Sequence, residues 1–163
     1  RHADPNVFVQ MDTYAVKGLQ SGQIQFLYAP THLNPTYEYG VTFERGTAVT
    51  YGDRKQIFIS GTASIDNKGE IVYPGDILKQ TERMLENIDV LLQEAGAGLQ
   101  DIMQAIVYLR DPADYVVVKQ YIESRYPSFL HLIVHAPVCR PGWLIETECI
   151  AVIPADAPQY AYL

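Results

Sequence analysis

Two acidic residues, Glu146 and Glu148, stand two positions apart in the apolar run 144–153. Successive side chains of a β-strand alternate between its faces, so both carboxyl groups point to the same face if this run is a strand. Burial raises the pKa of a carboxyl group because the charged form is desolvated. A carboxyl group with a raised pKa suits general acid catalysis near neutral pH. The alternative is a solvent-exposed face at a sheet edge, where the pair has no such role.

The cysteines and histidines offer less chemistry. Cys139 follows His135 by four positions, which is about 13 Å along a regular strand and too far for a thiol to reach an activating base. The same distance prevents His131 and His135 from binding one metal ion, and no other cluster has metal-ligand spacing. Ser60-Gly61-Thr62 lacks the lysine and the following helix of a phosphate-binding loop. We therefore expect no metal and no cofactor, and Cys139 is predicted to be a buried, unreactive thiol near the pocket.

Composition restricts the class of protein. The chain has 163 residues, 48% of them hydrophobic and 19% charged, with a net charge of −7. This length predicts one domain with a real core. An acidic chain without a Lys/Arg run has no surface for nucleic acid or an anionic membrane. The longest apolar runs are far too short to cross a bilayer. Two cysteines without a secretory segment predict a reducing, cytoplasmic setting.

Two helices are predicted. The first runs from about Ile77 to Ala95, where apolar residues recur at three- and four-residue steps. Asp76 can cap its N-terminus, and Gly96 ends it. The second extends from Asp111 to about Tyr126, with a proline in its first turn.

Strands are predicted where short apolar runs lie between glycine- and proline-containing turns. These runs are 24–28, 41–44, 48–51, 56–60, 71–73, 102–109, 130–138 and 144–153. Two helices covering one face of a mixed sheet give a two-layer α+β domain. The other face would still carry apolar residues, which favours oligomerisation. We expect an N-terminal extension over residues 1–35, a domain over 36–154 and a C-terminal tail over 155–163.

Three segments resemble the RidA/YjgF superfamily, whose members are also described as endoribonuclease L-PSP-like and translation-initiation-inhibitor-like. They are 57–65 (IFISGTASI), 75–96 (GDILKQTERMLENIDVLLQEAG), and 101–121 taken together with 145–152 (IETECIAV). The resemblance implies a chorismate-mutase-like α+β fold, a homotrimer, and ligand clefts between subunits.

RidA itself hydrolyses reactive enamines and imines. By resemblance, Glu146 is the carboxylate that helps to place the attacking water. The family's Ser-Gly strand end falls on Ser60, Gly61 and Thr62, and a tyrosine before the first strand falls on Tyr37 or Tyr39, of which we favour Tyr39. RidA also grips the substrate carboxylate with an arginine on the penultimate strand. Residues 131–136 contain no arginine, and Lys119 stands where the family often has asparagine.

The run 138–146 (VCRPGWLIE) is closer to chorismatases, whose catalytic half has the same fold. In that comparison Glu146 protonates an enol ether or orients water, and Arg140 can hold a carboxylate, because a guanidinium forms bidentate contacts with one. Cys139 and Trp143 would flank the site. Arg45 is a second candidate cation and Arg125 a third. A surface role in a turn is the alternative for Arg140.

These observations predict a homotrimeric small-molecule hydrolase or deaminase that acts on a carboxylate-bearing metabolite in an intersubunit cleft. The labile group is an imine or an enol ether. The main alternative is a non-catalytic metabolite-binding trimer. The family's association with RNA is a third possibility, and the net charge of −7 disfavours it.

Overall fold

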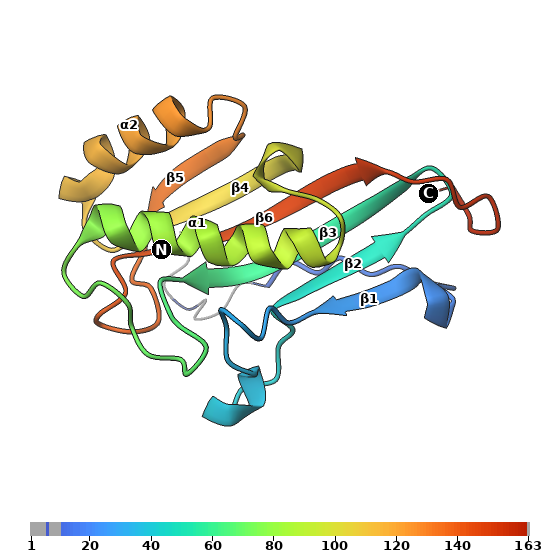
Figure 1. Ribbon diagram of the computed structural model, residues 1–163, viewed down its shortest axis with the longest axis horizontal. Coiled ribbons are helices and arrows are strands. Elements are labelled where there is room, and N and C mark those ends of the chain that lie inside the picture. The colour runs from blue at the N-terminus through green and yellow to red at the C-terminus, as the bar shows by residue number, and fades with distance from the viewer. Residues whose placement is uncertain (1–5, 7–10, 163) are drawn as a thin grey trace.

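The long amphipathic helix forms where the spacing predicted it. In the computed structural model, which describes residue 6 and residues 11–162, helix α1 covers Ile77–Glu94 and the Asp76 side chain caps it by accepting from the backbone N–H of Lys79. The second helix, α2, is shorter (Tyr115–Arg125) and follows a 3-10 turn at Pro112–Asp114. Both helices lie on one face of a single sheet (Figure 1). The two-layer α+β fold is confirmed.

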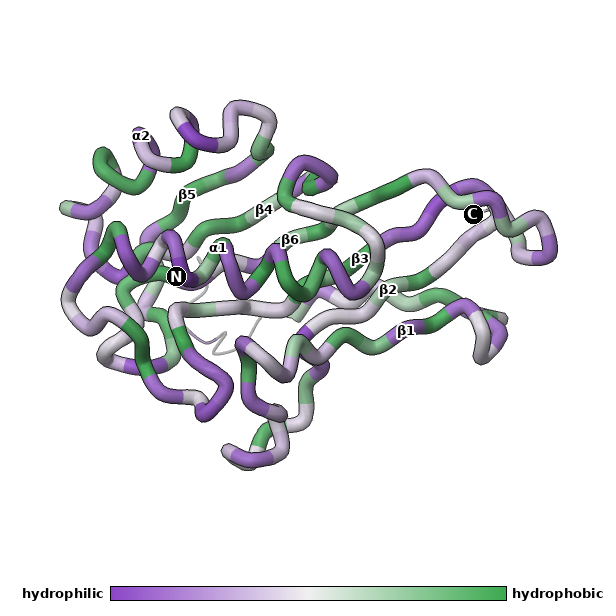
Figure 2. The backbone as a smooth tube through the Cα atoms, viewed as in Figure 1, coloured by the Kyte–Doolittle hydropathy of each residue, from purple (hydrophilic) through white to green (hydrophobic). Residues whose placement is uncertain are grey.

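Six strands form that sheet in the order β1-β2-β3-β6-β4-β5. Only the β4–β5 pair is parallel, and all other neighbours are antiparallel. The central strands β3, β6 and β4 lie beneath α1, and Figure 2 shows their apolar residues against more hydrophilic loops. The strands are β1 (Ile24–Leu27), β2 (Gly46–Thr50), β3 (Arg54–Ala63), β4 (Ile102–Leu109), β5 (His131–His135) and β6 (Ile145–Pro154).

Three strand predictions need correction. No strand forms over 41–44, because the hydroxyl of Thr36 donates to the carbonyl of Phe43 and holds this segment against the 3-10 turn at Thr36–Tyr39. The predicted strand 71–73 is reduced to one bridge between Ile65 and Ile71. The predicted strand 130–138 shortens to β5, after which the chain turns away from the sheet.

The side chains of β6 alternate between the two faces of the sheet. Ile145, Thr147, Cys149 and Ala151 are buried beneath the helices. Glu146 and Glu148 therefore lie on the opposite face, which no described helix covers. The strand registers also place apolar side chains on this open face: Ile150 of β6 itself, and Phe26, Phe58, Ile106 and Leu132 of the other strands.

The segment between residue 11 and β1 crosses this open face, on the side of the sheet away from α1 (Figure 1). The ring of Tyr14 lies 5.7 Å from that of Phe58 on β3. A cavity of about 430 Å³ separates the segment from the sheet, and Asp12 and Tyr14 form part of its wall. The predicted extension over 1–35 thus contributes both a covering segment and the edge strand β1, although residues 1–5 and 7–10 lie outside the described part.

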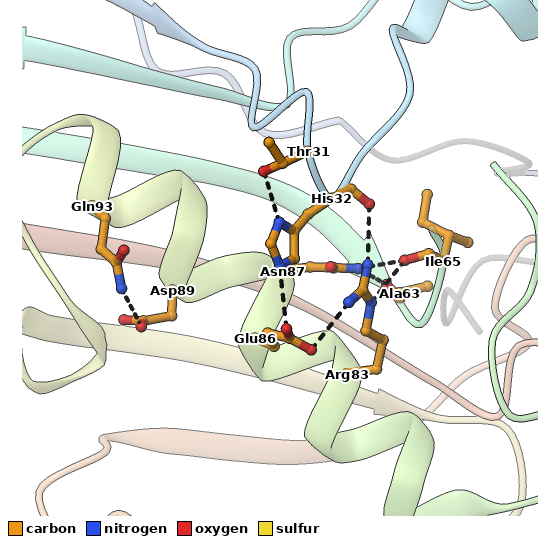
Figure 3. Close-up of polar contacts among 9 residues, drawn as sticks. All are labelled: Thr31, His32, Ala63, Ile65, Arg83, Glu86, Asn87, Asp89 and Gln93. Carbon is orange, nitrogen blue, oxygen red and sulfur yellow. Dashed lines mark hydrogen bonds and ion pairs between the residues drawn. The ribbon is translucent and has the colours of Figure 1, made fainter. Parts of the chain in front are cut away.

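The end of β3 that carries Ser60-Gly61-Thr62 is fastened to α1 by buried polar contacts (Figure 3). Asn87 is fully buried, and its amide donates to the carbonyls of Ala63 and Ile65, each at 3.0 Å. Arg83 donates to the carbonyl of Ile65 and also pairs with Glu86. These contacts fix the strand end relative to the helix layer.

Among the described residues no helix is long and apolar enough to cross a membrane.

Candidate active site

A β-bulge places the Glu146 carboxyl group. The pairing of β3 with β6 shifts register between Ile59 and Thr62, so Ser60 and Gly61 form an irregularity beside Glu146. A Cβ atom on Gly61 would stand 2.2 Å from Oε1 of Glu146. A side chain at this position would force the Glu146 carboxyl group, which is the flexible end of its side chain, to move. Glycine therefore allows this carboxyl group to lie against the bulge.

The environment of Glu146 favours its protonated form. Burial raises the pKa of this carboxyl group above its ordinary value, and the charge of Glu148 raises it further. The backbone N–H of Cys139 partly offsets both effects. The direction agrees with the one predicted from the sequence, and a raised pKa brings a carboxyl group closer to what general acid catalysis requires.

Glu148 is held by a tyrosine that sequence reasoning did not assign to the site. The Tyr108 hydroxyl donates to Oε1 of Glu148 at 2.9 Å. Burial, this hydrogen bond and the two carboxylates raise the pKa of Tyr108 to about 12, so its hydroxyl remains a donor. Only the cross-strand pairing of Tyr108 with Glu146 could have revealed this partner.

Two guanidinium groups flank the ring of Tyr39. The Cζ atoms of Arg45 and Arg140 lie 5.4 and 5.5 Å from its centroid. Arg45 is buried and donates to both the backbone and the side-chain oxygen of Asn34. Arg140 is exposed and also lies over the Trp143 ring at 5.6 Å. Within the described chain it has no ion pair or side-chain hydrogen bond, so its guanidinium is available to a ligand.

Arg110, immediately after β4, organises the loop that carries Arg140. Its guanidinium donates to the backbone carbonyls of Val138, Arg140 and Trp143 at 2.6, 2.6 and 2.8 Å. From the opposite side, buried Gln80 of α1 donates to the Gly142 carbonyl and accepts from the Leu144 N–H. Sequence reasoning missed the role of Arg110, because a basic residue after a strand usually indicates only an exposed turn.

Of the other predicted site residues, some lie near Glu146 and Tyr39 and one does not. The Ser60 hydroxyl donates to the Glu44 carbonyl at 2.6 Å and that of Thr62 to the Ser60 carbonyl at 2.9 Å, so both stabilise the bulge. Cys139 is exposed beside Tyr39 rather than buried. Lys119 is not brought into this group, since it lies on α2 and its ammonium pairs with Glu123.

Trp143 closes one side of a cavity of about 270 Å³ that Tyr39 and Arg140 also line. Its indole Nε1 is buried and finds no acceptor among the described residues. In the same part of the chain, no group of three or more His, Cys, Asp or Glu residues could hold a metal ion. The arrangement can thus bind an anion through Arg140 and move protons through Glu146.

Comparison with known proteins identifies the family. The model of the family described as endoribonuclease L-PSP matches residues 46–153, well over half of the chain. The chain belongs to the endoribonuclease L-PSP family. A RutC family protein of Pyrococcus abyssi is 40% identical over 98 residues, which are 58% of this chain and 76% of that protein. The 3-aminoacrylate deaminase RutC of Acinetobacter baylyi is 31% identical over 97 residues, 58% of this chain and 77% of that protein.

Solved structures in the family share the fold. RidA from an Antarctic Psychrobacter bacterium has a TM-score of 0.65 and 23% identity, covering 79% of this chain and 99% of that one. Escherichia coli YjgF has a TM-score of 0.63 and 22% identity, covering 78% of this chain and 98% of that one. The RidA/YjgF resemblance is confirmed. Tyr39 and Arg45 precede the residues matched to the family, so their proposed roles depend on the geometry described above.

Proposed function

We propose that this protein is a hydrolytic deaminase of enamine and imine carboxylates, with Glu146 as its proton-transfer group. The observation that carries the proposal is a half-buried carboxyl group with a raised pKa that lies against Gly61 and accepts from the backbone N–H of Cys139, the residue before Arg140. The relation to a 3-aminoacrylate deaminase supports the same reaction class.

The proposed chemistry adds water and releases ammonia. Protonated Glu146 gives its proton to the enamine carbon, which converts the enamine into an iminium ion, the protonated imine, and leaves Glu146 as a carboxylate. A water molecule then attacks the imine carbon, and Glu146, now a carboxylate, accepts a proton from it. The second water proton goes to nitrogen, the C–N bond breaks, and ammonia leaves behind a carbonyl group. The protein begins and ends this sequence with the same protonated glutamate.

Arg140 is proposed to hold the substrate carboxylate in place of an arginine on the penultimate strand. Its guanidinium lies between two aromatic rings, which orient it without using its hydrogen-bond donors. The loop carrying it is fixed by Arg110 and Gln80. A bidentate contact from this position would orient the imine for attack.

We further propose that the chain works as a homotrimer that buries the open sheet face. Apolar side chains remain on that face, including Phe26 at 48% and Leu132 at 61% exposure. Removing apolar area from water stabilises association by about 25 cal/mol per Å². Since Glu146 lies on the same face, a neighbouring copy would wall its cleft and exclude bulk water.

A second candidate is hydrolysis of an enol ether by the same residues. The grouping of Cys139 and Arg140 around Tyr39, with the Cys139 N–H directed to Glu146, favours it. Protonation of an enol-ether carbon needs the same carboxylic acid as protonation of an enamine. The substrate therefore decides between the two reactions.

The test is a comparison of two substrates with the purified protein. Imines are generated in solution by an amino-acid oxidase, and ammonia release is followed above the spontaneous rate; chorismate is incubated separately and pyruvate is measured. We expect accelerated ammonia release. Pyruvate release from chorismate alone would replace deamination with enol-ether hydrolysis. Thermal stabilisation by 2-oxo acids without turnover of either compound would mean a metabolite-binding protein.

A further inference from the structure

The 270 Å³ cavity extends from Arg140 to a second cation that the proposed reaction does not use. Lys68, in the turn after β3, lines the same cavity as Arg140. Within the described part of the chain, the Lys68 ammonium forms no ion pair or hydrogen bond. The backbone N–H of Lys68 is the group that supports the turn, by donating to Asp66 at 2.9 Å. The side chain is therefore free to contact a ligand.

A buried amide faces the same space. Asn34 is only 4% exposed and lines the cavity. Its Oδ1 accepts from Arg45 at 3.0 Å and its Nδ2 donates to Glu38 at 3.3 Å, so its orientation is fixed. An amide nitrogen has two hydrogens, which leaves one for a further acceptor. Burying an amide donor is costly unless it has a partner, which favours an acceptor in the cavity.

The backbone at Gly69 keeps this space open. Its φ of +78° is a conformation that residues with side chains rarely adopt, and a Cβ there would lie 2.9 Å from Nδ2 of Asn34. The glycine thus brings the Lys68 turn close to the buried amide. The turn and the amide together form one end of the cavity, while Arg140 and Trp143 form part of the rest of its wall.

The charged side chains that line the cavity leave Lys68 as a second cation for a ligand. Lys68 and Arg140 contribute two positive charges, and Glu38 contributes one negative charge. If Arg140 holds the carboxylate next to the reacting imine, Lys68 remains for an acceptor farther along the substrate. Glu38 is already an acceptor for Asn34.

We propose that Lys68 and Asn34 bind a distal carboxylate, so that the preferred substrates are imines of dicarboxylic amino acids. This inference rests on the proposed function, because it assigns Arg140 to the carboxylate beside the imine. Lys68 and Asn34 act as specificity-determining residues and take no part in bond breaking. A charge-assisted hydrogen bond to one carboxylate corresponds to about tenfold in affinity.

The experiment measures binding, so it does not require turnover. Calorimetric titration compares 2-oxoglutarate with 2-oxobutanoate, the dicarboxylic and monocarboxylic forms of the deamination product. It is done on the wild-type protein, on Lys68→Ala, and on Lys17→Ala, whose exposed lysine does not line this cavity. We expect wild type and Lys17→Ala to prefer 2-oxoglutarate by about tenfold, and Lys68→Ala to lose that preference while keeping its affinity for 2-oxobutanoate.

Equal affinities of the wild-type protein for the two acids would overturn the inference, as would an unchanged preference in Lys68→Ala. Thermal melting of each variant checks that the fold is retained. The imine assay tests the deaminase activity separately. If the protein prefers 2-oxoglutarate but releases no ammonia, the subsite is supported and the deaminase activity is contradicted. If the protein releases ammonia but binds 2-oxoglutarate and 2-oxobutanoate equally well, the activity is supported and the subsite is contradicted.

Discussion

Gly61 in the bulge of β3 lies directly against the carboxyl group of Glu146 on β6. An added methyl group would lie 2.2 Å from Oε1, well inside van der Waals contact. The bulge in β3 and the position of Glu146 on β6 therefore depend on each other, because the missing side chain at Gly61 leaves room for the Glu146 carboxyl group.

Gly61→Ala tests this dependence. Because the Glu146 carboxyl group ends a flexible side chain and can move aside, the substitution should cost only about 1 kcal/mol of stability. By displacing the carboxylate it should lower kcat/KM by about a hundredfold. In a Glu146→Ala background the methyl group meets no carboxylate, so the same substitution should cost less than about 0.5 kcal/mol. Denaturant unfolding of the four proteins in this cycle measures the coupling. An equal cost of Gly61→Ala in both backgrounds would show that the clash lies elsewhere.

The raised pKa of Glu146 predicts a pH-dependent effect on stability. The pKa of Glu146 is higher in the folded protein than in the unfolded chain. At pH values between these two pKa values the folded protein binds more protons than the unfolded chain, so its stability falls as the pH rises through this range. Glu146→Gln has no proton to lose there. We expect its Tm to exceed that of the wild type near neutral pH, and the difference to vanish below the ordinary value of 4.5. A Tm difference that does not change with pH would contradict the burial of this carboxyl group.

Arg110 is predicted to position the Arg140 loop without touching the substrate. Arg110→Lys keeps the charge but cannot donate to the Val138, Arg140 and Trp143 carbonyls together. We expect KM for the imine to rise by about tenfold with a smaller change in kcat. Arg125→Lys, at an exposed position on α2, should leave both constants unchanged. If the two variants behave alike, the loop does not depend on Arg110.

Assembly through the open face predicts that a charge there separates the copies. Leu132→Glu places a carboxylate at a side chain that is 61% exposed in the single chain. Analytical ultracentrifugation should show a trimer for the wild-type protein and a monomer for this variant. Leu78→Glu, on the exposed side of α1, is the matched control and should remain trimeric. A monomeric wild-type protein would contradict the proposed trimer.

Periodic and local signals made most of the fold predictable. α1 and β4 have the predicted bounds to within a residue, since their apolar spacing and flanking caps are unambiguous. The run 41–44 resembled a strand because its side chains alternate, but a hydroxyl from outside the run holds its backbone away from the sheet. Alternation predicts which residues share a face and does not by itself supply a neighbouring strand.

The site was predictable where residues lie on one strand or in one loop. Glu146, Cys139 and Arg140 fall within eight positions. The structure places Cys139 and Arg140 beside Tyr39, and the backbone N–H of Cys139 donates to Glu146. The contributions of Arg110, Tyr108 and Asn34 depend on segments far apart in the sequence that meet only through the sheet order and the loops. Lys119 was selected from a motif position alone, and its helix carries it into an ion pair with Glu123.

The role of Glu146 in proton transfer is tested by single-turnover hydrolysis of an imine generated in solution, with the wild-type protein and Glu146→Gln compared, alongside calorimetric binding of the 2-oxo acid product. We expect ammonia release by the variant to fall to the spontaneous rate while binding of the product is unchanged. Ammonia release at the wild-type rate by a variant that binds the product normally would show that Glu146 does not transfer the proton.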